Sequence, residues 1–266
     1  MSFSITGKTA IVTGAANGIG LAIARQFADK GANVMFADMD EKKLIEELGA
    51  QLDEGNVRFF AGDLRQRLTI ANLVSATIDA FDRVDILVNA SRQVMTTEAL
   101  NVEDTSVEVL LQQNVMTALH LSQQVARRMI KQGEGIEEGS LGSIVNLSSI
   151  AARQTRPELL GYSVAMAALD QMTRSLAVSL APHRIRVNAV AFGSVMSASL
   201  QSSMSEHVEW RDDILEQTPL GRIAPPSELA DAVQFLAAES SGFMTGEIVT
   251  IDGGRSLLDA VTIPAH

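Results

Sequence analysis

The amino-acid sequence predicts an α/β fold, a doubly wound parallel sheet of seven strands with helices on both faces. Short apolar runs alternate with longer helical segments, and 46% of the 266 residues are hydrophobic, enough to bury one large core. A glycine-rich turn directly after the first apolar run is typical of a strand-turn-helix unit. We therefore expect a single domain over residues 1–266. Its strands are expected around Thr9, Val34, Val57, Ile86, Ile144, Val187 and Val249.

The first expected strand, residues 8–13, leads into a turn with the spacing Gly-x-x-x-Gly-x-Gly. Glycines permit positive φ there and let backbone N–H groups approach a pyrophosphate, and the N-terminus of the following helix, residues 19–30, favours negative charge. Ordinary tight turns also use glycine, so the turn alone leaves a purely structural role open. As a dinucleotide site it would include Gly14, Asn17, Gly18, Ile19 and Gly20.

The second expected strand, residues 33–37, ends at Asp38, eighteen residues after Gly20 and close to the spacing of a ribose-binding acid. A carboxylate there accepts hydrogen bonds from both ribose hydroxyls of NAD and repels the 2′-phosphate of NADP. Neither the glycine turn nor the adjacent Met39 has a guanidinium that would offset this repulsion. The alternative is a solvated aspartate at a strand end. We expect Asp38 and Met39 in a site for NAD.

A serine and a tyrosine follow the fifth expected strand, residues 143–147. Tyr162 comes thirteen residues after Ser149, and Met166 comes four residues later. With the glycine turn, this pattern resembles the short-chain dehydrogenase/reductases from end to end of the chain, although that family has a lysine at the position of Met166. The resemblance implies a Rossmann-type sheet with strand order 3-2-1-4-5-6-7.

The resemblance also implies roles for three polar side chains. The Ser149 hydroxyl would bind the substrate oxygen, and the Tyr162 hydroxyl would exchange a proton with it. Asn114 would hold a water that contacts the lysine in relatives. Without the family pattern, Tyr162 would be read as a packing residue of a helix and Asn114 as an ordinary polar helix residue. The implied catalytic residues are Asn114, Ser149 and Tyr162.

Further cofactor contacts rest on the resemblance as well. It assigns Asp63, after the third strand, to the adenine amino group with the Leu64 backbone beside it, while capping of the next helix is the competing role for Asp63. The family's Asn-Asn-Ala-Gly segment reads Asn89, Ala90, Ser91, Arg92 here, so Arg92 either crowds the cofactor or points into solvent. The remaining contacts implied are Asn89, Ala90, Tyr162, Val195 and Ser197.

Loss of the lysine has an electrostatic consequence. An isolated tyrosine has a pKa near 10, and a unit charge at about 4 Å contributes about 4 kcal/mol at an effective dielectric near 20. Met166 provides no such charge, so we expect oxidation of an alcohol to require higher pH and reduction of a carbonyl to suffer less. Either Arg92 or Arg153 could restore a cation. Met166→Lys should raise turnover if the site works.

The family's Pro-Gly turn after the sixth strand appears as Phe192-Gly193, which places an aromatic ring near the nicotinamide. A substrate lid is expected over about residues 194–217. Its Met204 and Trp210 suit an apolar or amphipathic substrate, and packing in a closed oligomer would use the same residues. The polar, glycine-rich residues 131–142 are expected to form a surface loop.

Composition excludes several other classes of function. A net charge of −11 argues against nucleic-acid binding, and a chain without cysteine has no disulfide or thiolate chemistry. The four histidines are scattered, so no metal site is expected. Without a cationic leader or a long apolar run, we expect a soluble, cytoplasmic protein without membrane contact. The resemblance implies a homo-oligomer, specifically a tetramer.

Two functions follow from the sequence. The first is an NAD(H)-dependent oxidoreductase that interconverts a secondary alcohol and a ketone, weakened or specialised by loss of the lysine. The second is a catalytically inactive protein of the same fold that binds a nucleotide or acts as a scaffold. Departures from the family cluster around the nicotinamide while Asp38 and the glycine turn are kept, which supports the second function, although the first is the preferred interpretation.

Overall fold

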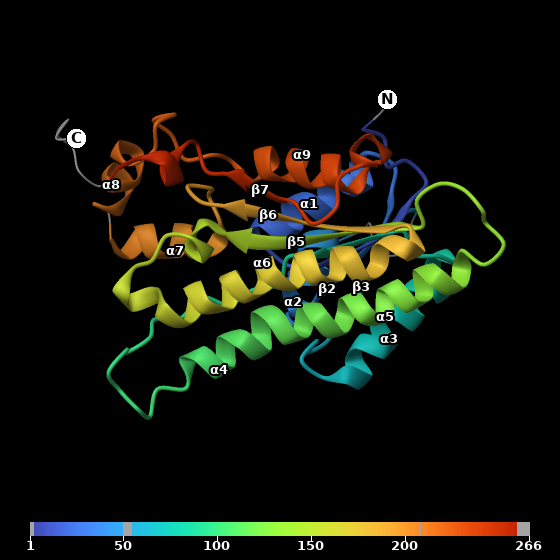
Figure 1. Ribbon diagram of the computed structural model, residues 1–266, viewed down its shortest axis with the longest axis horizontal. Coiled ribbons are helices and arrows are strands. Elements are labelled where there is room, and N and C mark those ends of the chain that lie inside the picture. The colour runs from blue at the N-terminus through green and yellow to red at the C-terminus, as the bar shows by residue number, and fades with distance from the viewer. Residues whose placement is uncertain (1–2, 50–54, 208, 260–266) are drawn as a thin grey trace.

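The computed structural model describes residues 3–49, 55–207 and 209–259. A sheet of seven strands lies at its centre, as Figure 1 shows for its place between the helices. The strand order is β3-β2-β1-β4-β5-β6-β7, and every neighbouring pair is parallel. This confirms the predicted Rossmann-type order. The strands are β1 Thr9–Thr13, β2 Asn33–Asp38, β3 Val57–Ala61, β4 Ile86–Asn89, β5 Gly142–Ser149, β6 Ile185–Phe192 and β7 Ile248–Ile251.

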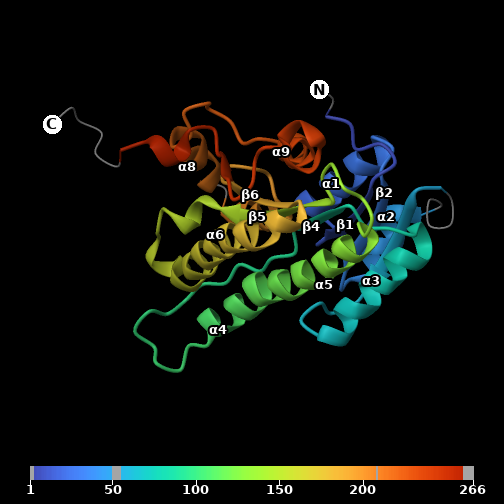
Figure 2. The same ribbon diagram turned by 45° about the vertical axis from the view of Figure 1, so that its right-hand side comes forward.

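Helices cover both faces of the sheet, and each layer closes its own part of the core (Figure 2). Phe27, Leu44 and Leu229 bury the apolar sides of α1, α2 and α9 in one cluster. Leu73 and Val125 bury those of α3 and α5 in a second cluster on the other face. The helices are α1 Gly18–Asp29, α2 Glu41–Leu48, α3 Arg67–Phe81, α4 Ser106–Leu111, α5 Thr117–Gln132, α6 Leu160–Leu180, α7 Ala198–Glu206, α8 Trp210–Glu216 and α9 Pro226–Ala237.

The apolar runs form strands because both sides of the central strands are covered. Along β1 the side chains alternate between the layers, with Ala10 and Val12 in the α1 cluster and Ile11 in the α3 cluster. All eight residues of β5 and of β6 are buried. Burial along the whole strand therefore marks the centre of the sheet, although β5 and β6 also carry buried polar residues such as Asn146 and Arg186.

The helical segment that contains Asn114 is interrupted in the structure. A π-helical turn, Gln112–Met116, separates α4 from α5, and the Thr117 hydroxyl donates to the Gln112 carbonyl at 3.0 Å. π-helical turns are rare and are frequent at functional sites. Asn114 lies in the middle of this one and bonds the backbone of Gln93, in the segment after β4.

The segment expected as a lid contains the two short helices α7 and α8. Ser194, just after β6, has a φ of 56° and its hydroxyl pairs with the Thr218 hydroxyl at 2.9 Å, which ties the two ends of the segment together. Trp210 stacks on the His207 ring with 4.4 Å between ring centroids. Among the helices of the described residues, none has the length and apolar character to cross a membrane.

Candidate active site

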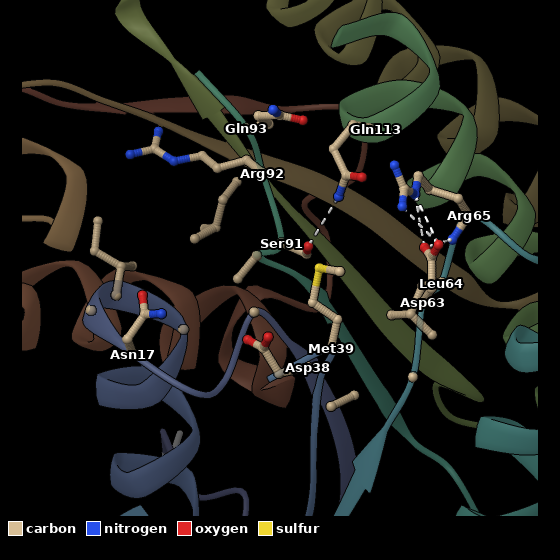
Figure 3. A pocket seen from close by; sticks show the side chains of 18 of the residues that line it. Asn17, Asp38, Met39, Asp63, Leu64, Arg65, Ser91, Arg92, Gln93 and Gln113 are labelled. Atoms are coloured by element: carbon tan, nitrogen blue, oxygen red, sulfur yellow. Dashed lines mark hydrogen bonds and ion pairs between the residues drawn. The ribbon is translucent and has the colours of Figure 1, made fainter. Parts of the chain in front are cut away.

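A cavity of about 490 Å³ opens at the carboxyl ends of β1 to β4 (Figure 3). Strands β2 and β4 pair with opposite edges of β1, so the direction of strand order reverses at β1. Open α/β sheets bind ligands at such a switch point. The residues predicted for the cofactor that line the cavity are Gly14, Asn17, Gly18, Ile19, Gly20, Asp38, Met39, Asp63, Leu64, Ala90 and Ser197.

The glycine turn is closely packed on both of its sides. Gly14 has a φ of +66°, and a Cβ there would lie 2.9 Å from the Ser91 Cα. A Cβ on Gly20 would lie 2.1 Å from the Gly14 carbonyl oxygen. Only glycine lets the turn sit this close to its neighbours, so the N-terminus of α1 faces the cavity with free N–H groups suited to an anion.

The segment after β4 is held against this turn by Thr13. The Thr13 hydroxyl oxygen accepts from the backbone N–H groups of Ala90 and Ser91, each at 3.0 Å. Gln113, in the π-helical turn, donates from its Nε2 to the Ser91 hydroxyl at 3.4 Å (Figure 3). The wall of the cavity opposite α1 is therefore fixed by side chains from two separate elements.

Asn114 has a positioning role in this structure. Its Oδ1 accepts from the Gln93 N–H at 2.7 Å, and its Nδ2 donates to the Gln93 carbonyl at 2.9 Å. The side chain is 3% exposed and does not line the cavity. Both ends of the amide are engaged, so the side chain fixes the backbone just after Arg92.

Asp38 lies at the end of β2 inside the cavity. One carboxylate oxygen accepts from the Ala16 N–H and the other from the Asp40 N–H, both at 3.1 Å. Each oxygen keeps capacity for a further hydrogen bond. The carboxylate thus braces the glycine turn and still presents acceptors for a pair of hydroxyls.

Asp63 is paired with a cation that the sequence analysis missed. Arg65 donates from Nε and Nη2 to both carboxylate oxygens, at 2.8 to 3.1 Å, and these hydrogen bonds lower the pKa of the Asp63 carboxyl. Both residues line the cavity. The spacing of Asp63 and Arg65, two positions apart, is the sequence feature from which this ion pair could have been predicted. Gln93 and Gln113, which also line the cavity, carried no signal beyond their nearness to Arg92 and Asn114.

Two predicted cofactor residues lie behind the cavity wall. Asn89 is buried, and its Nδ2 donates to Ser122 Oγ at 3.1 Å and to Asn146 Oδ1 at 2.8 Å. Val195 is 3% exposed and pairs with Ala224 in an isolated parallel bridge. Neither residue lines the cavity, so their side chains lie behind the residues that form its surface.

The two serines at the end of β5 have different surroundings. Ser148 donates to a carboxylate oxygen of Asp170 at 2.5 Å, and burial raises the pKa of the Asp170 carboxyl. Among the described residues, Ser149 Oγ has one hydrogen-bond partner, the nearby Ala151 N–H, from which it accepts at 3.2 Å, so its hydroxyl hydrogen remains available to a ligand. The structure therefore leaves Ser149, which the spacing selected, as the serine that can donate.

Tyr162 lies beyond the far end of the cavity, on α6. It is 4% exposed, and neither it nor Ser149 lines the cavity. One turn further along α6, Met166 is fully buried in the same apolar cluster as Tyr162. That cluster supplies no cation to the tyrosine hydroxyl.

Arg92 connects the cavity to Tyr162. Its Nη1 donates to the Tyr162 hydroxyl at 3.0 Å, and its guanidinium carbon lies 4.3 Å from the centre of the Phe192 ring. The side chain points away from Asp38 and the Asp63–Arg65 pair (Figure 3). The Arg92 side chain is thus not directed into open solvent. It lies between the cavity and Tyr162. Arg153, the other candidate cation, is exposed and donates to Thr250 Oγ1 at 3.0 Å.

Comparisons with known proteins agree with this geometry. Residues 14–256 match the family model described as Enoyl-(Acyl carrier protein) reductase. An uncharacterized oxidoreductase of Thermotoga maritima is 36% identical, with 94% of this chain and 98% of the relative covered. An NAD-dependent glycerol dehydrogenase of Listeria innocua is 29% identical, with 96% of each chain covered. The solved structure of gox2181 superimposes with a TM-score of 0.87 at 30% identity, covering 96% of this chain and 98% of that one. The chain therefore belongs to the short-chain dehydrogenase/reductase family of oxidoreductases.

Proposed function

We propose that this protein is an NAD(H)-dependent oxidoreductase that interconverts a secondary alcohol and a ketone. The observation that carries the proposal is the position of Arg92, which lines the cavity beside the glycine turn and contacts the Tyr162 hydroxyl at 3.0 Å. Arg92 therefore contacts both the proposed cofactor cavity and Tyr162, the proposed proton donor.

The residues of the cavity fit a dinucleotide. The N-terminus of α1 behind Gly14 would receive the pyrophosphate, and the Asp38 carboxylate would accept from the two adenosine ribose hydroxyls. A 2′-phosphate would meet that carboxylate, and the two arginines that line the cavity are engaged elsewhere, Arg65 with Asp63 and Arg92 with Tyr162. These contacts support NAD over NADP, as does the name of the Listeria relative.

The protein's own groups perform the proton chemistry. When bound, the reduced nicotinamide supplies a hydride, and so two electrons, to the carbonyl carbon. Ser149 donates a hydrogen bond that positions the carbonyl oxygen. The O–H bond of Tyr162 breaks as a new O–H bond forms on the product alcohol, which leaves a phenolate. Alcohol oxidation is the same sequence in reverse, with the phenolate as base.

A non-redox nucleotide-binding protein is the second candidate function. One observation favours it: the cavity ends at Arg92, and the Ser149 and Tyr162 side chains are nearly fully buried behind it. A nucleotide could occupy the adenosine end without reaching either hydroxyl.

A panel of ketones and secondary alcohols tests the first function. NADH consumption or formation is followed for the wild type, Tyr162→Phe (Y162F) and Ser149→Ala (S149A), with Ser179→Ala as a matched control at an exposed hydroxyl of α6. Positioned proton transfer contributes about 10² to 10⁴ in rate, so Y162F should lose turnover on that scale while S179A keeps it. Absence of turnover across the panel, or full activity of Y162F, contradicts the proposal.

A further inference from the structure

We propose that Arg92 is a catalytic residue of this protein, which supplies to the Tyr162 hydroxyl the positive charge that is missing at Met166. Phe192 holds the Arg92 guanidinium in place. The inference rests on the proposed function, since it concerns the residue that donates the proton there.

The need for a cation follows from the position of Tyr162. Proton donation leaves a negative charge on a side chain that is 4% exposed, and a buried charge is unfavourable unless it is paired and hydrogen-bonded. On α6 itself, Met166 is fully buried among apolar neighbours, including Leu110 and Leu169, and carries no charge. The partner must come from another element.

Arg92 meets this need from the segment after β4. The Tyr162 oxygen accepts from Arg92 Nη1 at 3.0 Å, so the hydroxyl's own hydrogen remains free to be donated to a substrate. Hydrogen bonds between a guanidinium and an anionic oxygen are about twice as strong as neutral ones. Within the described residues Arg92 makes no ion pair with a carboxylate, so its charge is not neutralised before the phenolate forms.

The direction of Arg92 is set by two contacts. Its guanidinium stacks over the Phe192 ring at 4.3 Å, a favourable cation–π distance. The backbone beyond it is fixed by Asn114, whose side chain bonds both polar groups of Gln93. Three positions where this chain departs from the family pattern, Arg92, Met166 and Phe192, are therefore one linked change: the cation moves from α6 to the β4 segment, and an aromatic ring holds it.

Other charged groups on the surrounding elements are engaged or exposed. Asp170 of α6 accepts from Ser148, and Arg153, after β5, donates to Thr250. Glu108 of α4 is exposed. Among these groups, Arg92 is the one whose contact with the Tyr162 hydroxyl changes the stability of the phenolate.

Ionisation of the phenol tests the inference without any substrate. Tyr162 is the only tyrosine in the chain, so the near-ultraviolet absorbance of tyrosinate reports this side chain alone. Arg92→Met (R92M) should require a higher pH than the wild type to ionise its phenol, and R92K should lie between them because it keeps the charge without the planar fork. Arg153→Met is the matched control and should titrate as the wild type does. If R92M titrates as the wild type does, the inference is wrong.

A charge exchange provides the kinetic test. With the ketone identified by the panel, R92M should lower kcat by about 10- to 100-fold, equivalent to about 1.4 to 2.7 kcal/mol at 1.36 kcal/mol per factor of ten. Contrary to the expectation from the sequence alone, Met166→Lys (M166K) should not raise kcat in the wild type, because Arg92 already supplies a cation, but it should restore most of kcat in R92M. Equal gains from M166K in both backgrounds would overturn the inference.

The outcomes separate this inference from the proposed function. If Y162F is inactive while R92M keeps its kcat and its phenol titration, the oxidoreductase function stands and the role of Arg92 is refuted. If no compound is turned over, the function fails, and the phenol titration still decides whether Arg92 stabilises the Tyr162 phenolate. Should M166K not fold, that titration decides alone.

Discussion

Replacing Asp38 by asparagine (D38N) should move the cofactor preference from NADH toward NADPH. The Asp38 carboxylate is half-buried at the end of β2, where its two oxygens accept from the N–H groups of Ala16 and Asp40. Asparagine keeps one oxygen acceptor, which can serve the Ala16 N–H of the glycine turn while the bond to the Asp40 N–H is lost, so the glycine turn should keep its shape. What changes is the negative charge at the adenosine ribose.

The size of the effect follows from the charges. Two unit charges about 4 Å apart repel by about 4 kcal/mol at an effective dielectric of 20, and salt reduces this in a cavity open to solvent. We therefore expect NADPH affinity to rise by about 10- to 100-fold in D38N. NADH should bind about tenfold more weakly, because hydrogen bonds to a charged acceptor contribute about 1.5 to 3 kcal/mol and an amide accepts fewer of them.

Fluorescence titrations of wild type and D38N with both reduced cofactors measure the four dissociation constants. Asp79→Asn, the same substitution at an exposed position of α3 outside the cavity, is the control and should change none of them. If the ratio of the NADH and NADPH dissociation constants is the same in D38N and the wild type, the Asp38 carboxylate does not contact the adenosine ribose. The assignment of Asp38 to the ribose would then be refuted.

Two further predictions concern the stability of the fold. Burial raises the pKa of the Asp170 carboxyl, so the folded state holds this proton more tightly than the unfolded chain does; the stabilisation is present below about pH 4 and is lost as pH rises through the raised pKa. D170N has no such loss, so its free energy of unfolding relative to the wild type should increase over that range in urea titrations, and a difference independent of pH would contradict this. Gly20→Ala would place a Cβ 2.1 Å from the Gly14 carbonyl oxygen and should lower both Tm and NADH affinity. Gly135→Ala, on the exposed loop before β5, should leave NADH affinity unchanged, and equal NADH affinity in both variants would count against the packing argument.

Much of the fold could be predicted because the central strands are buried on both faces. The apolar runs at residues 143–147 and 185–190 correspond to β5 and β6, which extend only a residue or two further. The strand order, by contrast, came from the family resemblance, since apolar runs alone do not say which strands are neighbours. The π-helical turn Gln112–Met116 was missed because a shift in backbone hydrogen bonding leaves no mark on the apolar pattern.

The site divides in the same way. Residues whose role depends on the backbone, such as Gly14 and Gly20, could be predicted from spacing, because the turn requires glycine wherever it lies this close to its neighbours. The direction of Arg92 could not, because it depends on Phe192, one hundred positions away in the sequence and brought close only by the fold. The pairing of Asp63 with Arg65 was not predicted, because the family pattern assigns a role to Asp63 and none to Arg65.

The most direct test of the account compares NADH with ADP-ribose, which lacks the nicotinamide, in binding titrations of the wild-type protein. In the proposed function the nicotinamide lies beside Arg92 and Tyr162, so NADH should bind at least about tenfold more tightly, a difference of about 1.4 kcal/mol. Equal affinities would mean that the nicotinamide end makes no contact with the protein. They would contradict the oxidoreductase function and favour a protein that binds only the adenosine part of the nucleotide.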